Sequence, residues 1–404
     1  MKTFLLSLAF ALVFLAYQPQ YFTQFIASLL TTTMSTAIVP TTQLALFIQT
    51  PKGAWVVKEH VVPTPESGEV LTRVEAAGLN PVDWKVHDYD FGVSGYPAVV
   101  GTDIAGVVVA IGAGVQNVQV GDRVLYQGLR TLRRAAFQHY SVSPAAIVAK
   151  IPSQLSFDQA ATIPVAAATA AVGLYSPNAA QSATLTAPWA EGGLGKYAGQ
   201  PILILGGSSA VGQAGKPPNI TKTYTQLITL SAPPVIQFAK LSGFSPIITT
   251  VSPSNFALTT SLGATHPLDR NAPLTAASLA AVTSKPITLI FDAVSSSETQ
   301  STAYGLLGEG GVLAIVLAAA IPEKDRVDGK RIVNPRGSAP DQGTFGEELY
   351  KHLGAYLEKG ELKPNKVQYV PGGLASIPDA LDRLRKGLVS GSKLVVRPSE
   401  TTTA

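Results

Sequence analysis

The fold is decided by one stretch of this 404-residue chain, Pro201-Ile-Leu-Ile-Leu-Gly-Gly-Ser-Ser-Ala-Val-Gly212. Residues 202–205 are four large apolar side chains in a row, which is typical of a buried parallel strand. Gly206, Gly207 and Gly212 then allow a tight turn and a close approach of the backbone to a ligand. A helix that begins there would direct its free N–H groups at a pyrophosphate. The stretch therefore predicts the strand, turn and helix of a dinucleotide-binding unit.

A second apolar run, Pro246-Ile-Ile-Thr-Thr-Val251, is followed by Ser252-Pro-Ser-Asn255. A dinucleotide-binding unit usually places an acidic residue here to bind the ribose 2′-hydroxyl, and this chain has none. Ser252 and Asn255 offer hydroxyl and amide donors, which suit a 2′-phosphate. The sequence therefore predicts NADP(H) rather than NAD(H), although the same Ser-Pro-x-Asn pattern also caps helices.

The composition indicates a compact α/β enzyme, because 46% of the residues are hydrophobic and only 14% are charged. The net charge is only +4, and the one tight basic group, Arg130, Arg133 and Arg134, is expected to be a solvated loop rather than a nucleic-acid patch. The chain has no cysteine, which excludes disulfides, thiolate zinc sites and cysteine nucleophiles. None of its five histidines pairs with another at metal-ligand spacing, so no metal site is expected.

The pattern of apolar residues changes near residue 166. Residues 44–165 contain short alternating runs separated by Gly, Pro and Asp, which are typical of β-structure. Later segments alternate between strands and helices and predict a parallel sheet covered by helices. The expected strands are 202–205, 246–251, 287–291 and 311–316, with helical patterns at 235–241 and 256–262; a helix at 377–386 and a strand within 391–397 end the chain.

The N-terminal segment, residues 1–36, is expected to lie outside the fold. Residues 4–16 are apolar after Lys2, which resembles a signal peptide, but no clear cleavage site follows and the run is short for a membrane span. Met34 offers a second plausible start. The segment is therefore either a secretion signal or the product of a mis-assigned start.

Two internal segments interrupt the expected pattern. Residues 177–198 are rich in Ala, Gly, Ser and Pro and predict a tolerated surface loop. Residues 215–234 fall inside the helix that should follow the glycine turn, and their four prolines cannot continue it. Joining Ala214 to Val235 gives a clean helical pattern. The segment is either a translated intron or a genuine insertion.

The chain resembles the zinc-free fungal enoyl-reductase and quinone-reductase-like branch of the medium-chain dehydrogenase/reductase superfamily. The resemblance covers residues 44–398 apart from the anomalous segment. It implies an α/β fold in which a Rossmann domain, 166–340, is inserted in a GroES-like β-barrel domain, 37–165, that the segment 341–404 completes. The motifs that carry it, in chain order, are Asn80-Pro-Val-Asp-Trp-Lys85, Gly101-Thr-Asp-Ile-Ala-Gly106, Val120-Gly-Asp-Arg-Val124, Arg134-Ala-Ala-Phe-Gln138, Ala160-Ala-Thr-Ile-Pro164, Gly206-Gly-Ser-Ser-Ala-Val-Gly212, Ser252-Pro-Ser-Asn255 and Leu262-Gly-Ala264.

Zinc-dependent relatives place a cysteine near Asn80–Pro81 and a Gly-His-Glu where this chain has Gly101-Thr-Asp103. Neither zinc ligand exists here. The resemblance therefore implies hydride addition to an activated C=C bond, where the substrate's own carbonyl accepts charge as an enolate and no Lewis acid is needed.

The resemblance also assigns candidate site residues. Lys85 would lie at the ribose and nicotinamide end of the cofactor, where it could orient the ribose or assist protonation of the enolate, while Asp83 is expected to cap the turn. Thr169 matches a threonine near the nicotinamide, or is a helix-interior threonine that bonds back to its own chain. The other expected cofactor contacts are Gly207, Ser208, Ser209, Ala210, Val211 and Gly212 in the phosphate loop, Ser252 and Asn255, Arg270 on the adenine side, and Val294 and Ser295 in a later crossover loop.

These residues predict an NADPH-dependent reductase of an enone, enoyl compound or quinone, in which the protein supplies mainly position and a water-poor cleft. A polyketide synthase is a possible partner, the enzyme is expected to be cytoplasmic unless the N-terminal segment exports it, and a monomer or homodimer is expected. Two alternatives stay open. One is a nucleotide-binding regulatory protein without turnover, and the other is a product that residues 215–234 disable.

Overall fold

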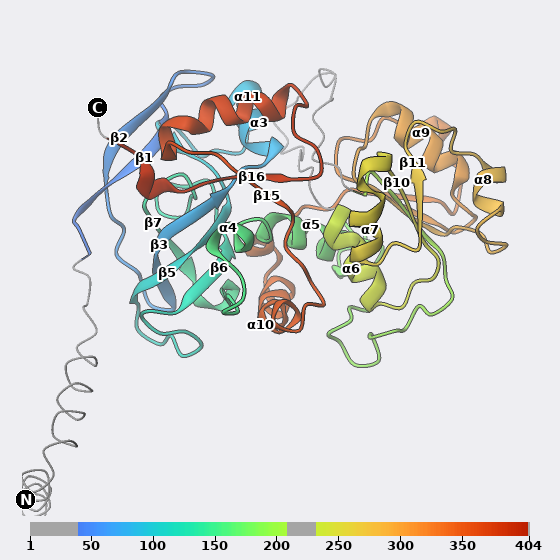
Figure 1. Ribbon diagram of the computed structural model, residues 1–404, viewed down its shortest axis with the longest axis horizontal. Helices are drawn as coiled ribbons and strands as arrows, with labels where there is room; N and C mark the ends of the chain where they lie inside the picture. Colours follow the sequence, from blue (N-terminus) through green and yellow to red (C-terminus); the bar gives the residue numbers. More distant parts are fainter. Residues whose placement is uncertain (1–38, 208–231, 403–404) are drawn as a thin grey trace, which may run out of the picture. The chain divides into compact units, whose positions relative to one another are not determined.

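The computed structural model describes residues 39–207 and 232–402 (Figure 1). The N-terminal extension, the phosphate-loop residues 208–212 and residues 215–231 of the anomalous segment lie outside the described residues. Everything below concerns the unit Thr41–Ala404.

The first half of this unit is a mostly antiparallel β-structure. β3 and β5 are its longest paired strands, and shifts in their register mark bulges that bend the sheet. A small sheet has the order β2-β1-β4, and the larger sheet runs β15-β16-β3-β5-β6-β8 with β7 also paired to β3. The strands are β1 (Thr42–Ile48), β2 (Trp55–Val61), β3 (Glu69–Gly78), β4 (Ala98–Val99), β5 (Asp103–Ile111), β6 (Arg123–Gln127), β7 (Tyr140–Pro144) and β8 (Ala149–Lys150).

Three helices accompany these strands. The helix α3 (Pro81–Tyr89) follows β3, and α4 (Phe157–Ala160) and α5 (Pro164–Tyr175) follow β8. The residues of α5 are buried on all sides, because the helix is almost entirely Ala, Val, Leu and Gly and has no polar face. Together, α4 and α5 span Phe157–Tyr175, which among the described residues is the one stretch long and apolar enough to cross a membrane. Most of it is buried inside the protein, so it serves as a core helix.

The second half contains a six-stranded sheet in which every strand pair is parallel. Its order is β11-β10-β9-β12-β13-β14, so the strands after β9 add first on one side and then on the other. Ligands of such sheets bind at this switch point, beyond the carboxyl ends of the strands. The strands are β9 (Ile202–Leu205), β10 (Ile247–Val251), β11 (His266–Asp269), β12 (Leu289–Asp292), β13 (Val312–Ile315) and β14 (Arg331–Val333), with helices α6 (Ala232–Leu241), α7 (Phe256–Leu262), α8 (Ala276–Ala280) and α9 (Ser297–Leu306).

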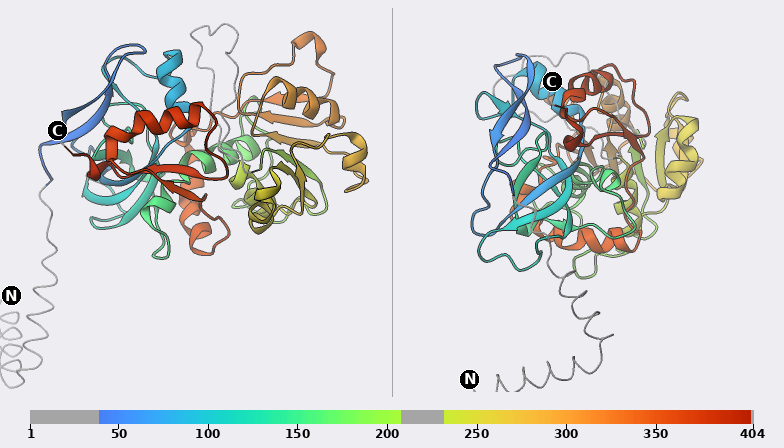
Figure 2. Two further views of the ribbon diagram at one scale, coloured as in Figure 1. Left: turned by 45° about the horizontal axis from the view of Figure 1, so that its top comes forward. Right: turned by 60° about the vertical axis from the view of Figure 1, so that its left-hand side comes forward.

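The C-terminal segment returns to the first half. β16 (Lys393–Val396) pairs with β3 in antiparallel register, with Val395 opposite Gly78, and with β15 (Val367–Tyr369) in parallel. The helix α11 (Ile377–Arg385) packs on α3, whereas α10 (Thr344–Glu358) packs near β8 and α5. These red elements lie beside the blue and green strands in Figures 1 and 2. The expected combination of a Rossmann-type parallel sheet and a GroES-like β-structure is confirmed.

Most predicted elements match the observed ones to within two residues at each end, but α6 begins at Ala232 rather than at Val235. Pro233 and Pro234 therefore lie inside a helix. Both lie in the first turn of α6 that the structure describes, where a missing N–H costs no helical hydrogen bond. Two of the four prolines thus do not interrupt the helix.

Residues 177–198 form the predicted loop, and most of them are exposed, but part of the loop packs into the core. The segment has no regular structure, but Ser182, Ala183 and Ala187 are buried. Trp189 packs edge-on against Tyr175 and Phe238, with ring centroids 5.5 and 6.1 Å away. Because this tryptophan packs between α5 and α6, it anchors the loop to the hydrophobic core.

The basic loop with Arg133 and Arg134 forms more ion pairs than a solvated loop is expected to form. Arg133 forms ion pairs with Glu66 and Glu69, and Arg134 pairs with the other oxygen of Glu69 at 2.6 Å. These pairs, with the neighbouring backbone bonds, lower the pKa of Glu69 against the opposing effect of burial. The two arginines therefore attach their loop to the start of β3.

Gly106 in β5 tests how tightly the antiparallel sheet is packed. A Cβ added there would lie 2.0 Å from the Arg73 carbonyl oxygen of β3, so Gly106→Ala should lower the free energy of unfolding by about 2 kcal/mol or more. Gly305 in α9 is the matched control, because a Cβ there meets no atom within 4 Å. Gly305→Ala should raise stability by about 0.5–1 kcal/mol through helix propensity. Urea unfolding of both variants is the measurement, and equal effects would contradict the packing.

Candidate active site

Lys85 lies on α3, a helix whose start is tightly specified. Pro81 occupies the first helical position, and the Asp83 carboxylate accepts a hydrogen bond of 2.8 Å from the backbone N–H of Asn80. Asp83 is therefore a cap, as expected. Burial raises the pKa of Asp83 to about 7, although the hydrogen bond from Asn80 and the nearby charge of Arg130 act in the opposite direction.

The Lys85 side chain is 1% exposed. Among the described residues its amine has no hydrogen bond or ion pair, and its one polar contact is with the ring of Trp84, whose centroid lies 5.4 Å from Nζ. Burial lowers the pKa of Lys85 to about 8. A buried amine without a partner is costly, and perturbed groups of this kind concentrate at functional sites.

Asp103, at the start of β5, joins the elements that carry the candidate residues. Its Oδ1 accepts the backbone N–H of Val165 at 2.7 Å, at the start of α5. Its Oδ2 accepts the Asn80 amide at 2.7 Å, before α3, and forms an ion pair with Lys393 of β16. Lys393 Nζ also donates to the Asn80 Oδ1 at 3.1 Å. The side chains of Asp103 and Lys393 are fully buried.

Thr169 lies one turn after Val165 in α5. Its hydroxyl donates to the Val165 carbonyl at 2.8 Å, so the alternative of a helix-interior threonine that bonds back to its own chain describes its present hydrogen bond. Gly337 lies against it, because a Cβ on Gly337 would be 2.0 Å from Thr169 Oγ1. After donating this bond, the Thr169 hydroxyl can still accept one from a nicotinamide. The contact between Thr169 and a nicotinamide therefore stays a prediction.

On the nucleotide side, the glycine turn directly follows β9. Gly206 has φ of +77°, which favours glycine. Gly207 lies so close to β10 that a Cβ would be 2.1 Å from Thr249 Oγ1. The predicted contacts Ser208, Ser209, Ala210, Val211 and Gly212 lie outside the described residues. The described part of the turn thus fits the close backbone approach that a dinucleotide requires.

Ser252 and Asn255, predicted to contact the 2′-phosphate, and Arg270, predicted on the adenine side, directly follow the carboxyl ends of β10 and β11. Ser252 follows β10, Asn255 begins α7, and the backbone N–H of Arg270 donates to the Val251 carbonyl at 2.9 Å. Neither Ser252 nor Asn255 makes a side-chain cap hydrogen bond. Arg270 is exposed. A hydroxyl, an amide and a guanidinium on one sheet edge fit a phosphate-bearing nucleotide.

Val294 and Ser295 follow β12, as predicted. Ser295 has φ of +57° and is buried. Its hydroxyl donates to the Asp292 carbonyl at 2.6 Å and accepts the N–H of Val316 at 2.8 Å. Ser295 therefore ties β12 to the end of β13, and the contact of these two residues with a cofactor stays a prediction.

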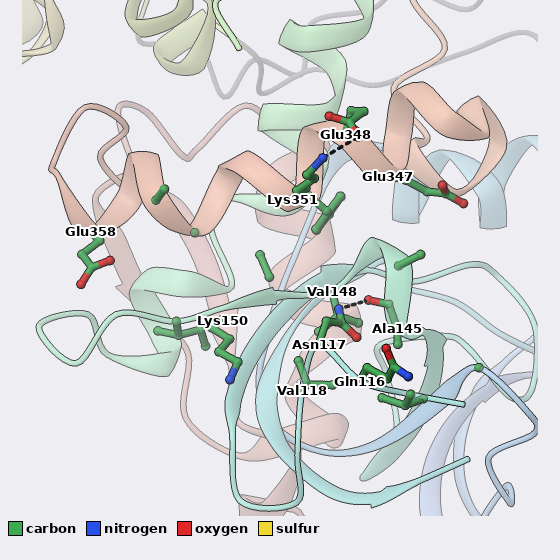
Figure 3. A pocket seen from close by; sticks show the side chains of 18 of the residues that line it. Gln116, Asn117, Val118, Ala145, Val148, Lys150, Glu347, Glu348, Lys351 and Glu358 are labelled. Atoms are coloured by element: carbon green, nitrogen blue, oxygen red, sulfur yellow. Dashed lines mark hydrogen bonds and ion pairs between the residues drawn. The ribbon is translucent and has the colours of Figure 1, made fainter. Parts of the chain in front are cut away.

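A separate groove of about 930 Å³ lies between α10 and the loops around residues 114–118 and 145–152 (Figure 3). Its charged side chains include Glu347, Glu348 and Lys351 of α10 and Lys150 of β8, and Glu348 pairs with Lys351 at 3.0 Å. The candidate site residues of the described chain do not line it. The groove is therefore distinct from the candidate active site.

Comparison with known proteins agrees with this geometry. Residues 66–153 match the family model of the alcohol dehydrogenase GroES-like domain, and residues 234–345 match that of the zinc-binding dehydrogenase. The chain is 31% identical over 392 residues to the enoyl reductase component lovC of the lovastatin nonaketide synthase of Aspergillus terreus, which covers 89% of this chain and 97% of that protein. The chain belongs to the trans-enoyl reductase branch of the medium-chain dehydrogenase/reductase superfamily.

Other relatives of this enoyl reductase branch agree. The trans-enoyl reductase grgB of a Penicillium species is 29% identical over 89% of this chain and 99% of its own length. Among solved structures, the quinone oxidoreductase of Coxiella burnetii has a TM-score of 0.64 at 23% identity, over 88% of this chain and 99% of its own. The protein is thus an oxidoreductase of this superfamily, and its Rossmann-type part binds a nicotinamide cofactor.

The residues of this oxidoreductase do not fit a zinc ion, despite the name of one matching family model. The chain has no cysteine, and the described residues contain no group of three or more His, Cys, Asp or Glu side chains placed for a metal. Where zinc-dependent relatives have ligands, Asp103 is bonded to a lysine ammonium. The ammonium of Lys393 thus supplies the positive charge next to Asp103.

Asp103 and Lys393 are the residues that sequence reasoning missed. The motif Gly101–Gly106 contains Asp103 but indicates no role for it, and the sequence indicates only a final strand around Lys393. The available signal was a lysine in Ser-Lys-Leu-Val-Val, whose four strand residues from Lys393 to Val396 are all buried. A lysine in a buried strand requires a counter-charge, but the sequence does not say which acid supplies it.

The lowered pKa of Lys85 predicts a pH-dependent stability. Its pKa falls from 10.5 to about 8 on folding. Below pH 8 the folded state therefore carries the full cost of burying the charged amine, about 3 kcal/mol of the free energy of unfolding. This cost disappears as the pH rises through 10.5, because the amine is then neutral in both states. Lys85→Met should therefore raise the free energy of unfolding at pH 7 and have little effect at pH 10.5. Urea titrations measure this, with exposed Lys324→Met as control. Equal stabilisation at both pH values would contradict a buried charged amine.

Proposed function

We propose that this protein is an NADPH-dependent, zinc-independent reductase that adds a hydride to the β-carbon of an enoyl or enone compound, with a quinone as the alternative acceptor. The observation that carries the proposal is the buried amine of Lys85, which no carboxylate neutralises among the described residues. The relatives named enoyl reductases and the quinone oxidoreductase neighbour support the same chemistry.

Lys85 would act on the substrate carbonyl or on the enolate that follows hydride addition. With a pKa of about 8, the Lys85 amine is protonated in most molecules at neutral pH. It releases its proton more easily than an ordinary lysine does. Nζ can thus donate a hydrogen bond to the developing enolate oxygen or deliver a proton to the α-carbon. Burial strengthens either interaction, because little water competes for the amine.

NADPH, when bound, supplies the hydride. Gly207 and the loop residues after it would hold the pyrophosphate, while Ser252, Asn255 and Arg270 would bind the 2′-phosphate at the edge of β10 and β11. Thr169 would orient the carboxamide end through the acceptor capacity of its hydroxyl. Val294 and Ser295 would border the nicotinamide half through their backbone.

Several wider features belong to the same proposal. The catalytic domain would comprise residues 37–165 and 341–404, and the nucleotide domain residues 166–340, which is supported by the pairing of β16 with β3. A polyketide synthase would present the enoyl chain, as the name of one relative suggests. The protein would act in the cytoplasm as a monomer or homodimer.

Oxidation of NADPH at 340 nm tests the activity directly. The Met34–Ala404 protein should consume NADPH with a short α,β-unsaturated thioester, and Lys85→Met should lower kcat by a factor of about 100 or more, in the range of a positioned proton donor. Lys85→Arg keeps a charge with a higher pKa and should recover little of the rate. A folded, NADPH-binding wild-type protein without turnover on thioesters, enones or quinones would support the inactive alternative.

The cofactor preference can be reversed at Ser252. Ser252→Asp places a carboxylate where the 2′-phosphate is proposed to bind, so like-charge repulsion should weaken NADPH binding at least tenfold. NADH binding should stay unchanged or improve, because an acid can accept the 2′-hydroxyl. Fluorescence titration of both cofactors measures this, with Ser254→Asp as an exposed neighbour control. Equal losses for both cofactors would contradict the assignment.

The same titration tests whether the anomalous segment, residues 215–234, permits cofactor binding. If the chain binds NADPH as it stands, residues 215–234 are tolerated. If binding appears only after their deletion, the segment is an error in the gene model. If neither form binds NADPH or NADH, the reductase proposal itself fails.

A further inference from the structure

We propose that Asp103 and Lys393 form a positioning pair that fixes the helices α3 and α5, and with them Lys85 and Thr169, in their working geometry. The inference rests on the proposed function, because it concerns the residues that this function assigns to substrate and cofactor. It adds a role for two residues that lie 290 positions apart in the sequence.

The carboxylate of Asp103 uses both of its oxygens on different elements. Oδ1 holds the first turn of α5 through the Val165 N–H at 2.7 Å, four residues before Thr169. Oδ2 holds the residue that begins α3 through the Asn80 amide at 2.7 Å, five residues before Lys85. Because the two donors approach different oxygens of the carboxylate, a side chain with a single acceptor oxygen can keep only one of these bonds in the same geometry.

Lys393 completes the arrangement from β16. Its ammonium pairs with Asp103 Oδ2 and donates to the Asn80 side-chain oxygen at 3.1 Å, so it contacts both ends of the Asn80–Asp103 bond. Gly78 of β3 makes room for the lysine stem, because a Cβ there would lie 3.0 Å from Lys393 Cε and 2.2 Å from the Ala161 carbonyl.

Two other groups interact electrostatically with the pair, and a third acts on one of them. Asp83 of α3 is influenced by both charges: Asp103 raises its pKa, and Lys393 lowers it. Tyr350 of α10 is buried, and its pKa is raised well above 10 by burial and by Asp103. Arg130 acts on Asp83 from the loop after β6. The pair therefore lies in a buried polar cluster to which β5, β16, α3 and α10 each contribute a side chain.

A purely stabilising role and a positioning role make different predictions. Buried ion pairs contribute little net stability, and replacing both partners by neutral residues of similar size is often neutral for folding. If the pair only stabilises the fold, such a replacement leaves kcat unchanged. If it positions α3 and α5, the neutral replacement folds but still lacks one of the two acceptors, and kcat falls.

The central variant is the double substitution Asp103→Asn/Lys393→Met. The asparagine keeps the size of the side chain but offers one acceptor oxygen, and its amino group faces the donor of either Asn80 or Val165. We expect a melting temperature within about 5 °C of the wild type, a kcat reduced at least tenfold, and a KM for NADPH changed less than threefold. Wild-type kcat in the folded double variant would overturn the proposal.

Asp103→Glu is a second variant in case the double variant does not fold. It keeps the charge and both acceptor oxygens but moves them by one methylene, so the ion pair persists while α3 and α5 are displaced. We expect kcat to fall at least tenfold. Unchanged kcat in this variant would also overturn the proposal. A matched control is Asp122→Asn/Lys150→Met, which removes an exposed ion pair of the same kind at 2.9 Å and should leave kcat unchanged.

A readout without turnover separates this inference from the proposed function. The chain has three tryptophans, and in a Trp55→Phe/Trp189→Phe background the fluorescence of Trp84 should titrate with the Lys85 amine above its ring. The wild-type midpoint is expected near pH 8, and the double variant should move it by at least 0.5 pH. An unmoved midpoint would contradict positioning even if the protein has no reductase activity, whereas a shift without turnover would contradict only the proposed function.

Discussion

The arrangement of the candidate site depends on one buried carboxylate. Asp103 accepts bonds from the start of α3, the start of α5 and the ammonium of Lys393 in β16. A buried charge is unfavourable unless it is paired and fully hydrogen-bonded, so these elements must come together for any of them to be placed correctly. The antiparallel pairing of β16 with β3 and the small residue Gly78 are the conditions that allow this contact.

Much of the fold could be predicted from the sequence, because local signals determine it. Ile202–Leu205 and its neighbours are short apolar runs bounded by glycine and proline, and each became a strand of the parallel sheet within two residues of the predicted ends. The features that the sequence did not indicate came from tertiary contacts. Residues 177–198 have the composition of a surface loop, but Trp189 packs with Tyr175 and Phe238. No local pattern indicates that contact.

The candidate site was predictable to a different extent in each part. The position of Lys85 after the turn residues Asn80 and Asp83 followed from a motif, and the capping role of Asp83 is confirmed by its bond to the Asn80 N–H. The counter-charge of Asp103 could not be predicted, because Lys393 is 290 residues away and ion pairing leaves no periodic trace in a sequence. The hydroxyl of Ser295 is bonded between β12 and β13, which the sequence did not indicate, and the contact of Ser295 with a cofactor stays a prediction.

The same corner of the molecule explains why the proposed reaction suits this chain. Zinc-dependent relatives place metal ligands where this chain has Asn80 and Asp103, and here both side chains are bonded to the ammonium of Lys393. That ammonium is fully buried and its charge is paired with Asp103, so it is not free to polarise a carbonyl. Lys85 differs, since its amine is buried and has no hydrogen bond or ion pair among the described residues. An α,β-unsaturated carbonyl needs only one such donor, because its own conjugation spreads the charge that hydride addition creates. One lysine paired with a carboxylate and one buried lysine without a counter-charge among the described residues thus favour reduction of an activated double bond over that of an isolated carbonyl.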